Sequence, residues 1–263
     1  MKKILVLGSK GMLGNAVCKY FSEKKDDYEI LTTNKRWGDE SFISELKDTK
    51  ADFIINCIGL IPQRKPTDEE YKIMNVDLPI FLDTIGKKVI HPSTDCEFLG
   101  NIANTQKYKK TDKRNADDVY GKSKAEASEW IENNARNTKI IRTSIIGHEE
   151  NSHIALLDWF LNSELEVKGY TNHYWNGITT LQWAKLCEEF INSWENYPVL
   201  NQYGTEENKN KYELLDIAKE VYGKIINIIP FESPNAVNKC LESDKIIPTI
   251  KTQLQELKTF YNL

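Results

Sequence analysis

A short apolar run near the amino terminus leads directly into a glycine-rich loop. The run covers residues 4–7, and the loop places Gly8, Gly11 and Gly14 in a GxxGxxG pattern before a helix-period stretch that ends at Phe21. In such a strand–loop–helix unit the first glycine permits a tight turn and the second lets the backbone approach a pyrophosphate. The third lets the helix pack against the strand, and the helix N-terminus offers free N–H groups to phosphates. The pattern predicts dinucleotide binding, and a plain strand-to-helix turn is the alternative.

Strand-like and helix-like segments then alternate through the first half of the chain. The expected strands are residues 4–7, 28–32, 53–58, 88–91 and 139–144, and the expected helices are 41–47, 69–86 and 124–134. This alternation predicts an α/β fold, a Rossmann-type doubly wound parallel sheet covered on both faces. The second half is less regular, with helical spacing at 154–161, 181–194 and 212–222 and β-like pieces at 198–202 and 225–230.

Two parts of unequal size are therefore expected. A nucleotide-binding domain would take residues 1–147, with residues 176–202 returning to it. A smaller α+β substrate-binding lobe would take residues 148–175 and 203–263.

Composition and charge exclude several classes of protein. The 263 residues include 35 Lys plus Arg and 39 Asp plus Glu, a net charge of −4, which does not favour non-specific binding to nucleic acid. The five cysteines form no CxxC pair, which argues against a disulfide framework and a structural zinc site, and no other metal site is indicated. No apolar run approaches the ~18–20 residues of a membrane span, and residues 4–7 are too few for an export signal. We expect a cytoplasmic protein with no membrane partner.

The end of the second predicted strand indicates which nicotinamide cofactor is preferred. A carboxylate there would bind a ribose 2′-hydroxyl, but residues 32–36 read Thr-Thr-Asn-Lys-Arg and the first carboxylate is Asp39. Lys35 and Arg36, with Lys10 in the loop, could hold a 2′-phosphate, which favours NADPH over NADH; the alternative is that they are simply solvated. The cofactor-binding residues expected from these two segments are Gly8, Lys10, Gly11, Met12, Leu13, Gly14, Asn34 and Arg36.

A tyrosine and a lysine stand four residues apart at the start of a predicted helix. This spacing puts Tyr120 and Lys124 on one helical face, where an ammonium would stabilise a phenolate and lower the tyrosine pKa. The lysine could also hold the nicotinamide ribose. Upstream, Thr94 follows the fourth predicted strand, where a parallel sheet opens toward its ligand, and its hydroxyl could polarise a carbonyl. Packing on a helix surface is the alternative for the tyrosine–lysine pair.

These motifs, Ser93-Thr94-Asp95, Val119-Tyr120-Gly121-Lys122-Ser123-Lys124 and Ile141-Arg142-Thr143-Ser144, resemble the extended short-chain dehydrogenase/reductases. The similarity is greatest to the dTDP-4-dehydrorhamnose reductase branch, which acts on nucleotide-linked 4-keto-6-deoxy sugars, and it covers residues 1–147 well and the rest loosely. It implies a catalytic triad of Thr94, Tyr120 and Lys124, the last two also touching the cofactor. It further implies that Asn75 is a supporting residue and that Cys57, Ile58 and Gly59 pass beside the cofactor. A homodimer through residues 69–86 and 124–134 is plausible on the same grounds.

The activity that the resemblance implies is NADPH-dependent reduction at C4 of such a sugar, in deoxysugar or surface polysaccharide biosynthesis. Tyr120 would protonate the carbonyl oxygen, and Thr94 and Cys96 would bind the substrate. Apart from the resemblance, the aromatic Trp175 could stack on a base or sugar of the substrate, and packing within the lobe is its alternative. A 4,6-dehydratase is not favoured, because its family motif has a glutamate directly after Thr-Asp. Here Cys96 takes that position and Glu97 comes one residue later, which in an extended segment would face the other way.

Two alternatives remain open from the sequence. Cys96 and His148 stand close to the places where GDP-fucose synthase, a relative, has a cysteine and a histidine that exchange protons at C3 and C5. The protein would then be a bifunctional epimerase-reductase. The other alternative is a non-catalytic NADP-binding regulator, although such a protein need not keep Tyr120 or Lys124. The sequence does not determine the nucleotide, the sugar or the product stereochemistry.

Overall fold

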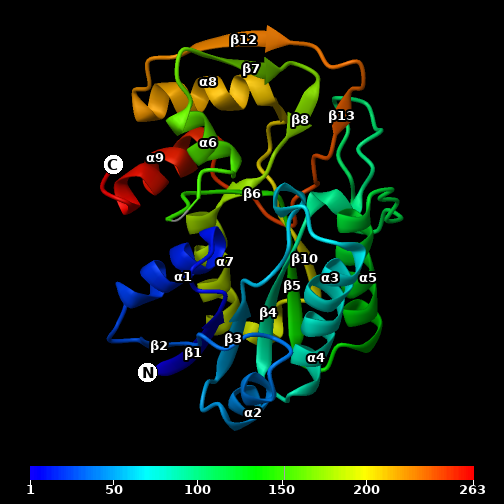
Figure 1. Ribbon diagram of the computed structural model, residues 1–263, viewed down its shortest axis with the longest axis vertical. Coiled ribbons are helices and arrows are strands. Elements are labelled where there is room, and N and C mark those ends of the chain that lie inside the picture. The colour runs from blue at the N-terminus through cyan, green and yellow to red at the C-terminus, as the bar shows by residue number, and fades with distance from the viewer. Residues whose placement is uncertain (151) are drawn as a thin grey trace.

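Six parallel strands form the main sheet of this computed structural model, which describes residues 1–150 and 152–263 (Figure 1). Their order is β10-β5-β4-β3-β1-β2, so the chain reverses its direction of travel across the sheet between β1 and β3. This is the doubly wound arrangement in which ligands bind beyond the carboxyl ends of the strands. The predicted fold class is confirmed. The strands are β1 (Lys2–Leu7), β2 (Tyr28–Thr32), β3 (Phe53–Asn56), β4 (Lys88–Ser93), β5 (Thr138–Arg142) and β10 (Leu200–Gln202).

Helices cover both faces of this sheet, which explains why its central strands are apolar throughout. Successive side chains of β1 point to opposite faces, so Ile4 and Val6 join one core while Leu5 and Leu7 join another. The first core is closed by α1 (Met12–Ser22) and α7 (Thr180–Asn192), and the second by α2 (Glu40–Asp48) and α4 (Leu78–Thr84). Helix α5 (Val119–Asn134) packs beside α4 and buries Ile131 against β5 and β10.

The segment expected as one long helix over residues 69–86 is divided into three. It begins with α3 (Asp68–Tyr71), whose first turn is closed by a capping box between Thr67 and Glu70. It continues as a π-helix over Lys72–Asp77 and ends as α4. The wider π turn includes the buried Asn75, and such turns are frequent at functional sites.

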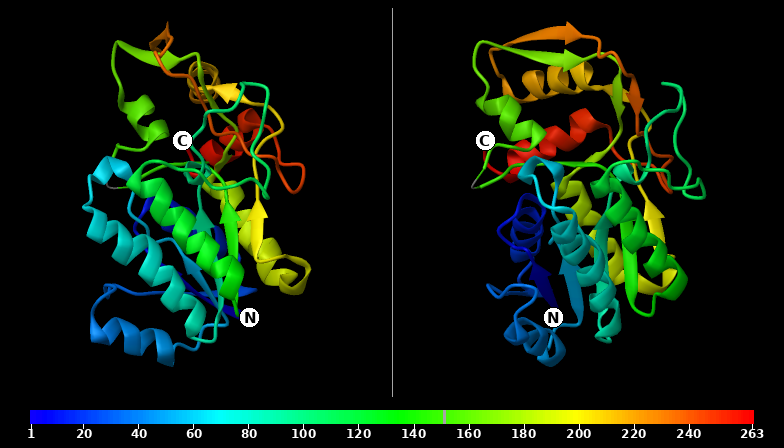
Figure 2. Two further views of the ribbon diagram at one scale, coloured as in Figure 1. Left: turned by 90° about the vertical axis from the view of Figure 1, so that its right-hand side faces the viewer. Right: turned by 45° about the vertical axis from the view of Figure 1, so that its right-hand side comes forward.

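The smaller lobe stands over the carboxyl ends of the main strands (Figures 1 and 2). Strand β7 (Glu166–Tyr170) pairs with β12 (Asn227–Phe231), and β8 (His173–Trp175) pairs with both β11 (Lys209–Asn210) and β13 (Val237–Asn238). The short pair β6 (Ile145–Ile146) and β9 (Ile178–Thr179) lies where the chain passes between the two parts. The lobe core is formed with α6 (Leu156–Asn162), α8 (Lys211–Tyr222) and α9 (Ile250–Phe260). Strand β10 is part of the main sheet, and helix α7 packs against that sheet. The exact domain boundaries stay a prediction.

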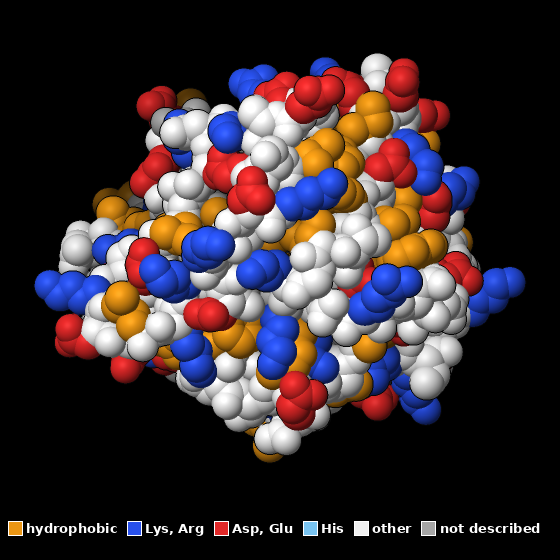
Figure 3. Space-filling model, turned by 90° about the horizontal axis from the view of Figure 1, so that it is seen from below, with side chains coloured by type: hydrophobic (Ala, Val, Ile, Leu, Met, Phe, Trp, Pro, Cys, Tyr) orange, Lys and Arg blue, Asp and Glu red, His pale blue; other side chains and the backbone are white. Residues whose placement is uncertain are grey.

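Charges of both signs are mixed on the face opposite the smaller lobe. Lys and Arg side chains lie there among Asp and Glu side chains, without a field of one sign (Figure 3). Within the described ranges, no helix is long and apolar enough to cross a membrane.

Candidate active site

The glycine loop has the backbone geometry that its sequence predicts. Gly8 has a φ of +75°, a left-handed conformation that favours glycine, and its carbonyl accepts the Gly11 N–H at 3.0 Å. A Cβ on Gly14 would overlap that same carbonyl, so only glycine lets α1 pack this closely against the loop. Helix α1 begins at Met12, and no side chain caps its N-terminus at Gly11. Its first N–H groups are therefore available to a phosphate, and the loop fits a dinucleotide.

The end of β3 lies directly beside this loop. The Cys57 N–H donates to the Leu7 carbonyl at 2.9 Å, and a Cβ on Gly8 would lie 3.0 Å from the Cys57 backbone. Asn75 anchors the segment that follows. Its Oδ1 accepts the Leu60 N–H at 2.8 Å, and its Nδ2 lies 3.1 Å from the Leu60 carbonyl and 3.2 Å from Ser123 Oγ on α5. Asn75 thus ties the segment of Cys57, Ile58 and Gly59 to the helix that carries Tyr120.

The three cations expected near the 2′-phosphate of the cofactor differ in their contacts. Lys35 Nζ forms an ion pair with Glu45 at 3.0 Å and donates to the Ser41 carbonyl at 3.1 Å. Lys10 and Arg36 are exposed, and neither has an ion-pair partner within the described part of the chain. Arg36 is therefore better placed than Lys35 to meet a phosphate beyond the end of β2.

Thr94 and Tyr120 come together where β4 meets the start of α5. Thr94 caps a 3₁₀ turn, η3 (Asp95–Glu97): its Oγ1 accepts the Cys96 N–H at 3.1 Å and donates to Asp95 at 3.0 Å. Gly121 permits the approach of α5, because a Cβ there would overlap the Cys96 carbonyl. Burial raises the pKa of Tyr120 above its usual range and Cys96 adds to this, whereas the Thr94 side chain lowers it.

The Lys124 side-chain nitrogen contacts residues of β4. Its Nζ donates to the Pro92 carbonyl at 2.7 Å and lies 3.3 Å from His91 Nε2, while His91 Nδ1 lies 3.1 Å from Asn56 Nδ2. Burial lowers the pKa of Lys124 to about 8, and Glu97 opposes this weakly. Burial is the largest influence on the pKa of both groups, and the expectation that Lys124 lowers the pKa of Tyr120 stays a prediction.

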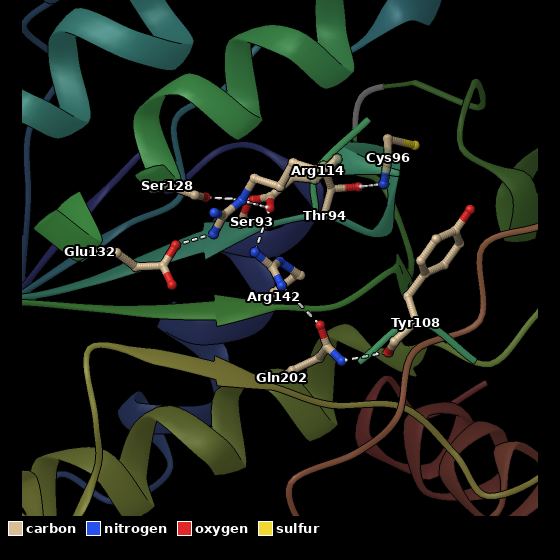
Figure 4. A network of polar contacts seen from close by, with 10 residues as sticks. Ser93, Thr94, Cys96, Tyr108, Arg114, Ser128, Glu132, Arg142 and Gln202 are labelled. Atoms are coloured by element: carbon tan, nitrogen blue, oxygen red, sulfur yellow. Dashed lines mark hydrogen bonds and ion pairs between the residues drawn. The ribbon is translucent and has the colours of Figure 1, made fainter. Parts of the chain in front are cut away.

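Glu97 lies in a buried ionic network, and Figure 4 shows its partners Arg114 and Arg142. Its carboxylate pairs at 2.6 Å with both Arg142 and Arg114, and the latter also pairs with Glu132. Ser93 and Ser128 donate to the same carboxylate. Burial by itself would raise the pKa of Glu97, but the two guanidinium groups outweigh it and hold the pKa below its ordinary value. Glu97 thus has a structural role. It lies in a 3₁₀ turn, whereas an extended segment was expected.

The remaining predicted site residues are separated in the structure. Cys96 lies beside Thr94, and burial, with a contribution from Asp95, raises the pKa of its thiol to about 12. His148 lies in the lobe, where its Nδ1 is 2.7 Å from Asp158 and its Nε2 is 2.8 Å from Tyr222. No observation here favours Cys96 and His148 as a pair of bases, because the thiol keeps its proton at neutral pH and both imidazole nitrogens are occupied.

Trp175 is buried at the end of β8. Only 3% of its surface is exposed, and its indole N–H donates to Ser144 Oγ at 2.7 Å. It thus packs within the lobe, and direct stacking on a substrate stays a prediction. Across residues 1–150 and 152–263, no group of three or more His, Cys, Asp or Glu side chains could hold a metal ion.

The fold and the glycine loop together define a Rossmann-type protein built to bind a dinucleotide. The chain belongs to the RmlD substrate binding domain family, whose model matches residues 1–168. The predicted resemblance to extended short-chain dehydrogenase/reductases of the dTDP-4-dehydrorhamnose reductase type is thereby confirmed.

Solved structures resemble this chain over its whole length, whereas a related sequence matches only part of it. The spore coat polysaccharide biosynthesis protein SpsK of Bacillus subtilis (strain 168) is 30% identical over 159 residues, which is 56% of this chain and 55% of that protein. A dTDP-4-dehydrorhamnose reductase structure from Clostridium acetobutylicum has a TM-score of 0.81 at 18% identity, covering 99% of this chain and 100% of that one. The Bacillus anthracis reductase in complex with NADP has a TM-score of 0.82 at 15% identity, covering 98% and 99%. At these identities the two structures show a shared fold.

Proposed function

We propose that this protein is an NADPH-dependent reductase of a nucleotide sugar, acting on the C4 keto group of a nucleotide-diphospho-4-keto-6-deoxy sugar. The observation that carries the proposal is the side-chain contact of Thr94, which follows β4, with Tyr120 at the start of α5. The family and the SpsK similarity support a role in making a surface polysaccharide.

The chain supplies the acid, the polarising group and the cation for this reaction. NADPH, when bound, supplies the hydride. Burial keeps the proton on Tyr120 at neutral pH, which is the state needed to protonate a developing alkoxide. The Thr94 hydroxyl, which donates to Asp95 in this structure, would turn to donate to the same carbonyl oxygen. Lys124, which is 5% exposed, would hold hydroxyls of the cofactor ribose.

NADPH oxidation with a panel of 4-keto-6-deoxy sugars linked to dTDP, UDP, GDP and CDP tests this proposal. We expect one member of the panel to be reduced much faster than the others. A solvent deuterium label at C3 or C5 of the product would instead favour the epimerase-reductase. If the protein binds NADPH but oxidises it with no sugar of the panel, the non-catalytic NADP-binding regulator would be favoured.

Removing the Arg36 guanidinium should weaken the preference for NADPH. A charge-assisted hydrogen bond of the kind expected to a 2′-phosphate contributes about 1.5–3 kcal/mol. We therefore expect Arg36→Ala to lower the ratio of kcat/KM for NADPH over NADH by at least about tenfold. Lys35→Ala is the matched control, and because Lys35 is already paired with Glu45 its effect should be smaller. A wild-type protein that already prefers NADH would contradict the assignment.

The affinity for NADPH should depend on the protonation of Lys124. With a pKa of about 8, Lys124 is an ammonium below that pH and a neutral amine above it, so its attraction for the cofactor weakens as pH rises. We expect the Kd of NADPH, measured by fluorescence between about pH 6.5 and 9.5, to increase as pH passes about 8. Lys124→Met should lose this dependence, and Lys122→Met, which alters an exposed lysine of the same helix, should keep it. A flat wild-type profile would show that Lys124 does not contribute.

A further inference from the structure

Lys124 stands at the end of a chain of buried hydrogen bonds that begins after β3. The Ile58 N–H donates to Asn56 Oδ1 at 3.0 Å, and Asn56 Nδ2 lies 3.1 Å from His91 Nδ1 on β4. On the other side of the imidazole, Nε2 lies 3.3 Å from Lys124 Nζ, which donates to the Pro92 carbonyl at 2.7 Å. Asn56, His91 and Lys124 are no more than 5% exposed, so their polar atoms must find partners within the protein.

The backbone sets the direction of this chain. The Ile58 amide can only donate, so the Asn56 atom that faces it must be the oxygen, and the amide nitrogen of Asn56 faces the imidazole. That NH₂ group can also only donate, so His91 Nδ1 must accept and carries no proton. Burial lowers the pKa of His91 well below its usual value, so the ring is neutral and its one N–H is at Nε2.

Two donors would therefore face each other if Lys124 were charged. An ammonium has three N–H donors and no acceptor, whereas a neutral amine has a lone pair that can accept the His91 Nε2–H. With the neutral amine every group in the chain has a partner, and an N–H of Lys124 still reaches the Pro92 carbonyl. The direction of the hydrogen bonds thus favours the uncharged lysine.

The charges around Lys124 do not reverse this preference. Glu97 of η3 favours the ammonium, but its carboxylate is already paired with Arg142 and Arg114. Tyr120, one turn earlier on α5, is buried and keeps its proton at neutral pH. Burial also disfavours a charge at Lys124. The hydrogen bonds and the burial therefore act in the same direction.

We propose that His91 is a positioning residue whose Nε2–H donates to Lys124 and favours the neutral amine in the cofactor-free protein. The inference rests on the proposed function, in which Lys124 holds the cofactor ribose and attracts NADPH as an ammonium. Because NADPH would then bind the protonated form better, linkage requires that its binding take up a proton near pH 8. His91 would thus make cofactor binding sensitive to pH, although it is itself a buried residue of β4.

The position of the imidazole proton tests the inference directly. Nitrogen NMR of the cofactor-free protein, labelled on its histidines, distinguishes a protonated ring nitrogen from a bare one, with His91 assigned through its backbone signals. We expect the proton of His91 on Nε2 at about pH 9, where Lys124 is mostly the amine. A proton on Nδ1 would overturn the inference, because Nε2 would then accept from Lys124.

Removing the imidazole gives a second test, in which the sign of the change separates a donor from an acceptor. The pKa of Lys124 would be followed by carbon NMR of lysine labelled at Cε, its signal identified by its absence from Lys124→Met. If His91 donates to the amine, His91→Leu should raise the measured pKa of Lys124 by about one pH unit, roughly tenfold in the acid dissociation constant, as expected for one hydrogen bond. A lower or unchanged pKa would contradict the inference. His173→Leu removes an imidazole of β8 in the lobe and should leave the pKa of Lys124 as it is.

The role of His91 and the proposed function can fail separately, because neither measurement requires cofactor or sugar. If Nε2 carries the proton and His91→Leu raises the pKa of Lys124, but no 4-keto sugar is reduced, the proposed reaction fails while the role of His91 stands. If a sugar is reduced while Nδ1 carries the proton, the reaction stands and the role of His91 fails. Should His91→Leu not fold, nitrogen NMR of the wild-type protein decides.

Discussion

Replacing Tyr120 by phenylalanine is expected to lower kcat by about 10²–10⁴-fold, the usual contribution of a positioned general acid. The change removes one hydroxyl that carries the transferable proton, and it keeps the ring that packs 6.0 Å from Tyr71. A tyrosine is protonated at neutral pH, and burial raises the pKa of Tyr120 further, so the wild-type group carries the proton that is transferred. The loss should therefore appear in kcat, with the Kd of NADPH nearly unchanged.

A neighbouring tyrosine provides the control for this experiment. Tyr71 is also buried and lies beside Tyr120, so Tyr71→Phe removes a hydroxyl from the same surroundings. We expect that variant to keep kcat within a few-fold of the wild type. Tyr120→Phe retaining most of the wild-type kcat would remove Tyr120 from the mechanism, and a change in the Kd of NADPH alone would reduce it to a cofactor contact.

Glu97→Gln should be the most destabilising conservative change near the site. The side chains of Glu97 and Arg142 are both 0% exposed, so neutralising the carboxylate leaves a buried guanidinium without its counter-charge. Breaking a buried pair in this way costs about 3–5 kcal/mol of unfolding free energy. Urea unfolding followed by circular dichroism would measure the change. Arg114, which also pairs with Glu97, would retain Glu132 as a partner.

An exposed pair between α5 and the neighbouring π-helix provides the comparison. Glu126 pairs with Lys72 at 2.9 Å, and both side chains are about half exposed, so Glu126→Gln should change the free energy of unfolding by no more than about 1 kcal/mol. A Glu97→Gln protein as stable as this control would mean that the network does not stabilise the fold. A stable variant with a specific loss of kcat would instead indicate a catalytic role for Glu97.

Local patterns predicted the sheet domain well and the lobe poorly. Strands such as residues 53–56 are recognisable because burial on both faces makes them continuously apolar. In the lobe, β7 pairs with β12 some sixty residues later, and only the Ile225–Pro230 piece was expected as a strand there. Helix α9 has regular amphipathic spacing and was not predicted. A pairing between distant segments depends on packing that no local period encodes.

The candidate site also has features that the sequence predicts and contacts that only the fold decides. The glycine positions, the Tyr120–Lys124 spacing and the absence of a carboxylate after β2 are properties of short segments, so the sequence alone determined a dinucleotide loop and a pair of candidate catalytic side chains. Tertiary structure decided which groups meet: Lys35 pairs with Glu45, and Lys124 meets His91. It also decided that Glu97 meets Arg142. The physical reason is that a charge acquires its pKa and its partners from burial between segments far apart in the chain, whereas backbone conformation follows from neighbours.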